Sequence, residues 1–392
     1  MFTMQECRIA YGDLLKSIKS YLHMHLEVST QEYSTTGYIR NLLINIGVEI
    51  LELGLETGVV GLLRGAYPGP AVALRADIDA LPLTECSGDE DSSLETGKMH
   101  ACGHDVHMAG LLGAAMLLKR FQDRMHGSVV FVFQPAEETI EGANLVIESG
   151  LFEQMKIHAM FGLHVRPDIP IGHVGVRAGA LMSAKDSFSI CIKGTGGHAS
   201  MPQDTVDPIV AGAAVVSALQ SIVSRNVVPQ EAAVLSVCSI HAGSADNIIP
   251  DALTMLGSMR SCSEHVREKA MARIAEIAGG VAGAYGCRAQ TEFLSHVPML
   301  VNDPALAEIA RHSAIAAFGE GNVVEPAIEM ISEDFAEYAR LTPIFFYYLG
   351  VGTQGREYRA LHNPAFHADE QSPVAGAVLL AQSVWQTQRE LA

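Results

Sequence analysis

The sequence predicts an α/β protein made of a two-part domain, whose sheet is flanked by helices, and an inserted ferredoxin-like α+β domain. Strand patterns alternate with helical patterns up to about residue 165, which is typical of a sheet with helices on both faces. Beyond about residue 180 the predicted order becomes strand, helix, two strands, helix, strand, which is a complete ferredoxin-like unit. A chain of 392 residues is long enough for two domains. We expect 1–179 and 296–392 to form one domain and 180–295 to form the other.

Each element of the first part follows from its own hydrophobic pattern. The buried strand AVALRADIDALP ends in acidic residues at a proline turn, and the strands GSVVFVFQPAEE and AMFGLHV come later in the chain. Because side chains at the carboxyl ends of such strands converge on the ligand crevice, we expect RADID, QPAEE and GLHV to meet there. The expected elements are a helical region over 9–46, a strand over 71–82, a helix over 105–121, a strand over 127–138, a helix over 142–150 and a strand over 159–165.

The insertion and the last part of the chain are predicted in the same way. The insertion is expected to contain strands over 186–194, 232–243, 252–262 and 288–295 and helices over 208–225 and 263–285. The segments EDFAEYAR, PIFFYYLGVG and LHNPAFHADE follow, and a helix ends the chain. This last part is expected to rejoin the first sheet.

Composition excludes some classes of partner. Hydrophobic residues make up 48% and charged residues 18% of the chain, which is enough for a large core and a large oligomer interface. The formal net charge is −18 and the sequence has no basic stripe, so we expect neither nucleic acid nor a membrane surface as a partner. An anionic ligand would have to be held by specific arginines.

The cysteines and the start of the chain indicate a compartment. The seven cysteines are odd in number and scattered, which favours reduced thiols in the cytosol. The opening residues, MFTMQECRIAYGDLLK, lack the basic and apolar regions of a signal peptide. No apolar stretch is expected to reach the ~18 residues that a transmembrane helix needs. We therefore expect a cytoplasmic protein.

The stretch MHACGHDVHMAG places soft, coordinating side chains just before a predicted helix. Cys102 and His104 combine a thiol with an imidazole, and the amino terminus of a helix favours a thiolate. The pair is therefore a good start for a transition-metal site. Glu137 and Glu138 follow a strand, where adjacent side chains point apart, so one could bind metal while the other faces a water bound to it.

His164, at the end of a predicted strand, and His362, in LHNPAFHADE, are the other candidate ligands. Taken alone, each would be an ordinary surface or hydrogen-bonded histidine, the cysteine a buried inert thiol, and the glutamates a solvated pair. Together, five coordinating residues at strand and helix ends of one sheet favour a metal site. The roles of His100, Asp105 and His107 stay open between support of the ligands and simple capping or packing.

The sequence gives less support to other kinds of active site. A cysteine protease would pair Cys102 with a distant histidine and asparagine, but the two glutamates would then have no role. The sequence has no G-x-S-x-G elbow, no P-loop and no G-x-G-x-x-G after a strand. The segment GTGGHASMP is nearest to a phosphate loop and lacks its Lys-Ser/Thr ending.

A series of motifs that contains these residues resembles a known family. In chain order the motifs are RADIDALPLTE, MHACGHDVHMAG, FQPAEE, FGLHV, GTGGHASMP, IHAGSADNIIP, GSMR, SEDF and LHNPAF. The series is similar to that of the metal-dependent aminoacylase and carboxypeptidase family. Within it, the likeness is to the amidohydrolase subfamily of hippurate hydrolases, N-acyl-amino-acid deacetylases and plant auxin-conjugate hydrolases. The resemblance covers nearly the whole chain and implies a two-part catalytic α/β domain with an inserted lid, commonly paired across a dimer.

The resemblance also implies roles for particular residues. The implied ligands of two divalent metal ions per subunit (zinc, manganese, nickel or cobalt) are Cys102, His104, Glu138, His164 and His362. Glu137 becomes the general base. His198, Asn247 and Arg260 match positions that contact substrate, and His198 is expected to reach the active site of the neighbouring subunit. Capping of a glycine-rich turn by His198 and a structural salt bridge of Arg260 stay open as alternatives.

The implied substrate is an N-acyl amino acid with a free α-carboxylate. Arg260 can grip a carboxylate with two parallel hydrogen bonds, and Asn247 can add another. Cleavage of the amide bond would release a carboxylic acid and a free amino acid. The alternatives are a dipeptidase or carboxypeptidase of the same family and a relative that binds its ligand without turnover. The expected assembly is a homodimer through the lid domain or a higher oligomer.

Two places depart from the family's pattern. Leu26, in LHMHLEVS, stands where the family usually has a proline after a His-x-His pair, which affects a local turn and one wall of the acyl pocket. The acidic loop SGDEDSSLETGK, residues 87–98, is individual to this chain, and its role is open.

Overall fold

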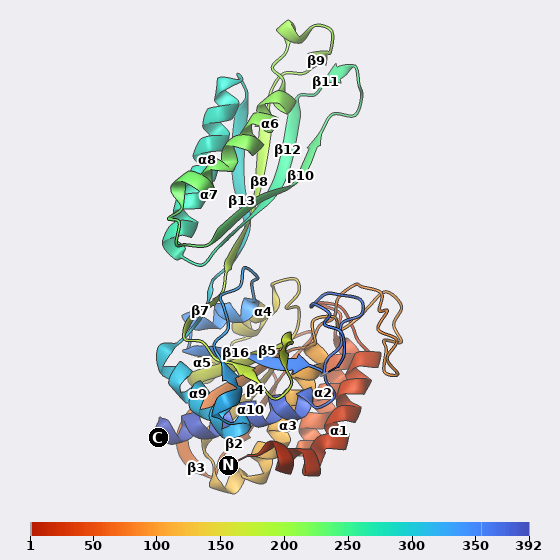
Figure 1. Ribbon diagram of the computed structural model, residues 1–392, viewed down its shortest axis with the longest axis vertical. Helices are drawn as coiled ribbons and strands as arrows, with labels where there is room; N and C mark the ends of the chain where they lie inside the picture. The colour runs from red at the N-terminus through yellow and green to blue at the C-terminus, as the bar shows by residue number, and fades with distance from the viewer. Residues whose placement is uncertain (1, 354, 392) are drawn as a thin grey trace. The chain divides into compact units, whose positions relative to one another are not determined.

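The computed structural model describes residues 2–353 and 355–391, and these form two units, each with its own core (Figure 1). The first unit comprises the described residues up to Gly179, Val301–Ala327 and the described residues from Asp334 onward, and the second comprises Ala180–Leu300 and Ile328–Glu333. The short segment of the second unit lies apart from the rest in sequence. It is held there because Ser183 donates its backbone N–H and its hydroxyl to the carbonyl of Ile331, at 2.9 and 3.0 Å.

An eight-stranded sheet forms the centre of the first unit (Figure 1). In spatial order its strands are β1 (Glu49–Leu51), β2 (Val59–Arg64), β4 (His126–Gln134), β3 (Tyr67–Asp77), β5 (Ile157–Pro170), β16 (Ile344–Gly352), β6 (Val174–Gly175) and β15 (Val323–Val324). The four middle strands, β4, β3, β5 and β16, are parallel, with Asp77 opposite Gln134 and His164 opposite Tyr348. Their carboxyl ends therefore lie at the same end of the sheet, and the last part of the chain contributes β16 to it.

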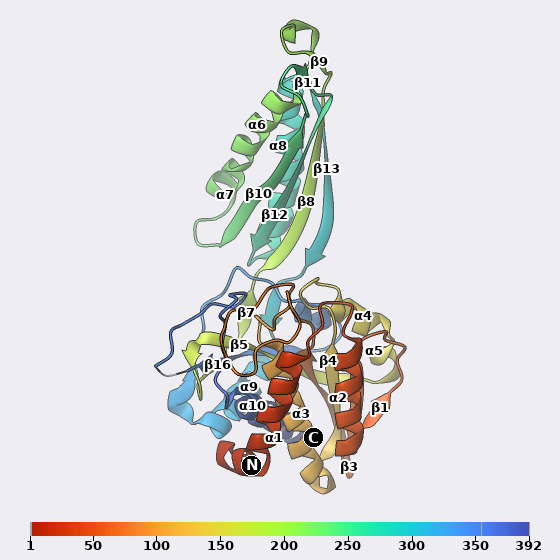
Figure 2. The same cartoon turned by 90° about the vertical axis from the view of Figure 1, so that its right-hand side faces the viewer.

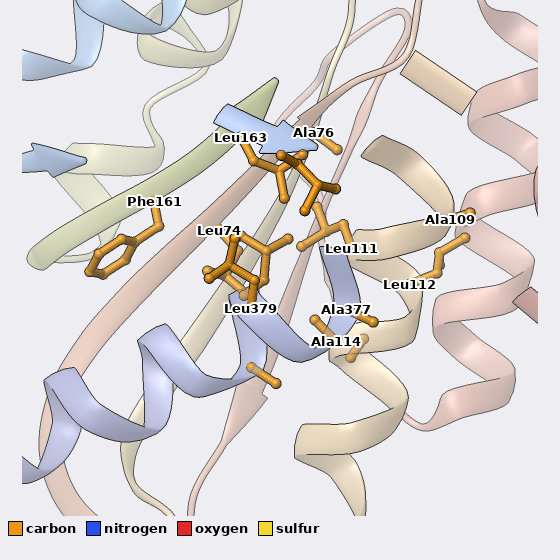
Figure 3. Close-up of a cluster of buried hydrophobic side chains, with 14 of the residues drawn as sticks. Leu74, Ala76, Ala109, Leu111, Leu112, Ala114, Phe161, Leu163, Ala377 and Leu379 are labelled. Atoms are coloured by element: carbon orange, nitrogen blue, oxygen red, sulfur yellow. The ribbon is translucent and has the colours of Figure 1, made fainter. Parts of the chain in front are cut away.

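Helices flank this sheet (Figures 1 and 2). α3 (His104–Arg120) and α10 (Ser372–Glu390) pack over its centre, where their apolar side chains meet those of β3 and β5 (Figure 3). The two helices approach closely because small residues face each other, and a Cβ on Gly113 would lie 2.6 Å from the Cβ of Ala377. The other helices are α1 (Met4–Met24), α2 (Tyr33–Ile46), α4 (Gly142–Glu148), α5 (Leu151–Gln154), α9 (Pro304–Phe318) and the 3₁₀ segments η1 (Gln122–Arg124), η3 (Glu320–Asn322) and η4 (Asp334–Arg340).

Burial on both faces explains why the middle strands have continuous apolar sequences. Val72, Leu74 and Ala76 of β3 belong to the core beneath α3 and α10. The alternate residues Arg75 and Asp77 are also buried, and Arg75 donates to Oδ2 of Asp77 at 2.7 Å. Polar side chains are therefore held inside the unit at the carboxyl end of the sheet.

The second unit contains a four-stranded antiparallel sheet with helices on one face (Figure 2). Its main elements are, in order, β8 (Ala184–Lys193), α6 (Pro208–Leu219), α7 (Ser221–Asn226), β10 (Ala233–Ala242), β12 (Ala252–Ser261), α8 (Glu264–Ala284) and β13 (Arg288–Val297). The sheet order is β10-β12-β8-β13. Phe188, Ile190 and Ile192, at alternate positions of β8, form the core with the helices. The short elements of this unit are β9 (Gly197–His198), η2 (Pro202–Asp204) and β11 (Ile248–Ile249). The paired strands β7 (Gly179–Met182) and β14 (Leu300–Asn302) each contain residues of both units.

One segment of the second unit, Pro208–Asn226, is long and apolar enough to cross a membrane by length and composition alone. This corrects the expectation that no apolar stretch reaches that length. The segment forms α6 and α7, and its residues Ala211, Val215 and Leu219 lie in the core of the unit. A core helix passes the same test, so one such helix is weak evidence for a membrane span.

Candidate metal centre

The amino terminus of α3 carries two of the candidate ligands. Gly103 caps the helix with φ +80°, in the left-handed region, and so turns the chain between Cys102 and His104. Nδ1 of His104 lies 2.8 Å from the carbonyl oxygen of Asp79. Because a carbonyl only accepts hydrogen bonds, Nδ1 carries a ring proton, which leaves Nε2 as the nitrogen that could coordinate a metal ion. Although burial favours the neutral ring, the carboxylates of Asp77 and Asp79 raise the pKa of His104 to about 10, so a bound cation would replace a proton at Nε2.

The loop after β4 brings the two glutamates to the same place. Ala136 has φ +54°, and its backbone N–H donates to Oε1 of Glu32 at 2.8 Å, which fixes the turn. Donor atoms of Glu137, Glu138 and His104 consequently lie within 4.8 Å of one another. Oε1 of Glu138 is 4.0 Å from Nε2 of His104.

Two histidines from distant parts of the chain complete the group. His164 lies within β5, which continues past it rather than ending there as the sequence predicts. Its Nδ1 donates to the carbonyl of Val165 at 2.9 Å, and its Nε2 lies 3.3 Å from Sγ of Cys102. His362, in the loop before α10, has φ +62°. Its Nε2 lies 3.2 Å from Sγ of Cys102 and 3.5 Å from Oε1 of Glu138.

The five candidate ligands form two groups of three donors that share one sulfur. One group is Cys102, His104 and His164, and the other is Cys102, Glu138 and His362. Within each group the donor atoms lie within 4.8 Å of one another. A thiolate shared by two such groups suits a pair of metal ions, and the mixture of thiolate, imidazole and carboxylate suits divalent transition metals.

The state of these donors fits a bound cation. Burial raises the pKa of the Cys102 thiol well above its usual value, and the carboxylates of Glu138 and Glu137 add to that effect. Burial lowers the pKa of His164 well below its usual value, so its ring is neutral. Oε1 of Glu138 and Nε2 of His104 are buried and have no hydrogen-bond partner in the described part of the chain. Metal ions would stabilise the thiolate and accept these lone pairs.

Asp79 holds two of the candidate ligands in place. Its carbonyl accepts from His104, and its carboxylate accepts the backbone N–H of Glu138 at 3.0 Å and the hydroxyl of Ser29 at 2.7 Å. This residue was not among those singled out from the sequence. The available signal was its place in RADID, a group of acidic residues at the carboxyl end of a buried strand.

His107 supports the strand that carries His164. Its Nε2 accepts the backbone N–H of Val165 at 3.0 Å, so Nδ1 carries the ring proton and donates it to Oδ1 of Asp77 at 2.6 Å. Asp77 is itself paired with Arg75. The sequence left open whether His107 supports the ligands or only packs, and these contacts favour support.

Asp105 and His100 have different environments. Asp105 accepts from Nδ1 of His23 at 2.9 Å and lies 3.5 Å from Nζ of Lys19, so it links α3 to α1. Although burial favours the neutral ring of His23, the carboxylate of Asp105 raises the pKa of that ring to about 9. His100 is buried, and neither ring nitrogen has a hydrogen-bond partner among the described residues. Burial lowers its pKa to about 3.

The three expected substrate contacts lie in the second unit. His198, on β9, is exposed, and its Nδ1 lies 2.9 Å from Oγ of Ser200. Asn247 is exposed next to β11, which pairs with β9. Arg260, on β12, is partly buried and donates to Oγ of Ser332 at 3.2 Å. Burial lowers the pKa of Arg260, and its guanidinium has no carboxylate partner within the described residues.

Comparisons with known proteins place the chain in a family. The model of peptidase family M20/M25/M40 matches residues 73–386. The chain is 41% identical over 369 residues to N-acetyl-L-cysteine deacetylase of Bacillus subtilis, covering 94% of this chain and 87% of that protein. It is 37% identical over 371 residues to thermostable carboxypeptidase 2 of Saccharolobus solfataricus, covering 93% of each.

A solved structure agrees with these matches. The YXEP protein of Bacillus subtilis, described as a dinuclear metal-binding peptidase of the M20 family, has a TM-score of 0.86 and 35% identity to this chain. The likeness covers 98% of this chain and 99% of that one. The family match over most of the chain, together with two donor groups built around one cysteine, identifies the chain as a member of peptidase family M20/M25/M40.

Proposed function

We propose that the protein is a metal-dependent amidohydrolase that cleaves the amide bond of N-acyl amino acids to release a carboxylic acid and a free amino acid. The observation that carries the proposal is the pair of donor groups sharing Cys102, with Glu137 beside them. The similarity to N-acetyl-L-cysteine deacetylase of Bacillus subtilis supports the substrate class. The family membership supports a hydrolase acting on amide bonds.

Five residues would hold two divalent ions. They are Cys102, His104, Glu138, His164 and His362. Bound there, two such ions would supply Lewis acidity toward an amide carbonyl and a water molecule. Zinc, manganese, nickel and cobalt are all compatible with a set that mixes soft and hard donors.

Glu137 is proposed as the general base. It is 7% exposed and lies against His104 and Glu138, so its carboxylate faces the place where the reaction occurs. It takes a proton from the attacking water as the oxygen joins the carbonyl carbon. It then gives that proton to the nitrogen as the C–N bond breaks, so one carboxylate serves both transfers.

Residues of the second unit are proposed to bind the substrate. Arg260 would bind the α-carboxylate, because it offers a guanidinium without a carboxylate partner in the described chain. Asn247 would add a hydrogen bond, and His198 would stabilise the oxyanion. We further propose that 180–295 is a lid and dimerisation domain on the catalytic domain formed by 1–179 and 296–392. His198 would then serve the active site of the neighbouring subunit in a cytoplasmic homodimer.

A carboxypeptidase or dipeptidase is the second candidate, and the carboxypeptidase relative supports it. Such an enzyme would accept a substrate with a free amino terminus. It would need an acidic group to hold the substrate ammonium in addition to the metal ligands.

Hydrolysis of a substrate panel tests the proposal. Wild-type protein is loaded with each of the four metals in turn, and release of free amino acid is measured for N-acetyl, N-benzoyl and indole-acetyl amino acids and for dipeptides. We expect kcat/KM to be highest for an N-acyl amino acid. A higher value for dipeptides would favour the second candidate, and a metal-loaded protein without turnover on any compound would contradict both.

A further inference from the structure

The acidic loop over 87–98 is anchored to α1. Asp91 accepts from Nζ of Lys19 at 3.0 Å and from Oγ of Ser20 at 2.9 Å. Lys19 is 14% exposed, so this anchor lies partly inside the first unit. The loop is therefore fixed at Asp91 to a helix that packs on the core.

Asp89 of the same loop contacts both ends of the segment 356–367, which carries His362. Its carboxylate oxygens accept from Nη2 of Arg356 at 2.7 and 3.0 Å, and Oδ2 also accepts from Nδ1 of His367 at 3.0 Å. Arg356 precedes His362 and His367 follows it, so one carboxylate joins the two sides of the segment. The three contacting side chains are between 24% and 38% exposed, so solvent screens the ion pair of Asp89 and Arg356 less than it would at the open surface.

His362 is the candidate ligand that local structure holds least firmly. Its side chain is 54% exposed, whereas those of His104 and His164 are buried. Its φ of +62° is a conformation that residues other than glycine keep only where surrounding contacts impose it. One such contact is the hydrogen bond from its backbone N–H to the carbonyl of Ala101, at 2.8 Å. That bond fixes the middle of the segment and leaves its two sides to other contacts.

We propose that Asp89 is a positioning residue for the metal centre: by holding Arg356 and His367 together, it keeps His362 in the conformation that faces Cys102. The inference rests on the proposed function only in taking His362 as a metal ligand. The contacts of Asp91 with α1 are part of this arrangement. Asp89 can order the segment that carries His362 only if the acidic loop that carries Asp89 is itself held in place. The acidic loop is thereby assigned a role in presenting the most exposed ligand.

Metal affinity provides the first test. Asp89→Asn is compared with Glu90→Gln, which removes the same charge from the next residue, an exposed one outside these contacts. Residues that contact a ligand directly contribute ~10–100-fold to metal affinity. Because Asp89 acts through a loop, we expect Asp89→Asn to bind one of two zinc ions about 3- to 10-fold more weakly in competition with a chelating indicator. Glu90→Gln should match wild type, and equal affinities in the two variants would overturn the proposal.

Trypsin cleavage after Arg359 provides a second test, because Arg359 lies in the segment 356–367 and a less ordered segment is cut faster. This test needs neither bound metal nor enzyme activity. Asp89→Asn should be cut faster than Glu90→Gln. Arg356→Gln should also be cut faster at Arg359, and adding it to Asp89→Asn should change nothing further, since the partner is already lost. The role of Asp89 would be refuted if Asp89→Asn and Arg356→Gln were both cut at the wild-type rate. It would also be refuted if the double variant were cut faster than either single variant. Wild-type protein that binds two metals and hydrolyses no N-acyl amino acid would overturn the proposed function while leaving this comparison valid.

Discussion

Replacing Gly103 by alanine is expected to destabilise the first unit, because of the backbone conformation and the close packing at this residue. It is also expected to disturb the metal centre, because Gly103 lies between the candidate ligands Cys102 and His104. Its φ of +80° lies in the region that residues with a Cβ rarely adopt. An added Cβ would also lie 2.4 Å from Cγ2 of Val165, which no real structure tolerates without movement. Val165 is buried on β5 and β-branched, so its side chain cannot rotate away easily.

The two effects have separable magnitudes. The left-handed conformation costs an alanine about 1–2 kcal/mol, and overpacking of a filled core costs about 1–3 kcal/mol. Gly97→Ala is the matched control, because Gly97 also has φ +80° and a Cβ there would meet nothing within 4 Å. The control therefore measures the backbone cost alone, and the difference between the variants measures the contact with Val165.

Thermal unfolding in the presence of a chelator measures this difference, since bound metal would add its own stabilisation. A change of 1 kcal/mol shifts the melting temperature by about 2–4 °C in domains of ~150–250 residues. Gly103→Ala should therefore melt at least about 2 °C below Gly97→Ala. It should also retain less metal, because Val165 adjoins His164. If the two variants melt together, the close approach of Gly103 to Val165 does not govern stability and the reasoning fails.

Three further substitutions test the proposed chemistry. Glu137→Gln should keep two metal ions per chain by elemental analysis and lower kcat by at least ~100-fold, because the proton acceptor is lost; near-normal turnover would contradict its role. Cys102→Ser replaces the shared sulfur by a harder oxygen, so its affinity should fall more for zinc than for manganese in parallel titrations; equal losses would argue against a sulfur ligand. Arg260→Ala should raise KM for N-acyl amino acids more than for their α-amides, and an equal rise would remove the carboxylate contact from the model of binding.

The main elements of the first unit could be predicted because each carries a local hydrophobic pattern. The limits of β5 could not. Its apolar run stops near Val165, yet the strand continues to Pro170. It does so because Gly350 and Gly352 of β16 keep pairing with Arg166 and Pro170. Strand length is set by hydrogen bonds to a partner from another part of the chain, and no local pattern reports that partner.

The same limit applies to the histidines of MHACGHDVHMAG. The sequence shows three imidazoles, and their residue type alone does not separate them. In the folded chain His104 faces Cys102 and Glu138, His107 joins Asp77 to the backbone of β5, and His100 has no hydrogen-bond partner among the described residues. Which nitrogen carries the proton is decided by the carbonyl or N–H that each ring meets. Those groups come from β3 and β5, so the roles follow from tertiary packing.

The sequence by itself determined the types of donor, one thiol, three imidazoles and a carboxylate, and their places at the ends of predicted elements. It also determined the alternation of strand and helix patterns, which places helices on both faces of a sheet. Only the tertiary structure decided that His362 lies 3.2 Å from Cys102, across a sequence separation of 260 residues, and that Asp79 and Asp89 support the group. The physical reason is that burial of the sheet faces aligns the strand ends in space, while distances between side chains depend on hydrogen bonds between segments that are remote in the chain.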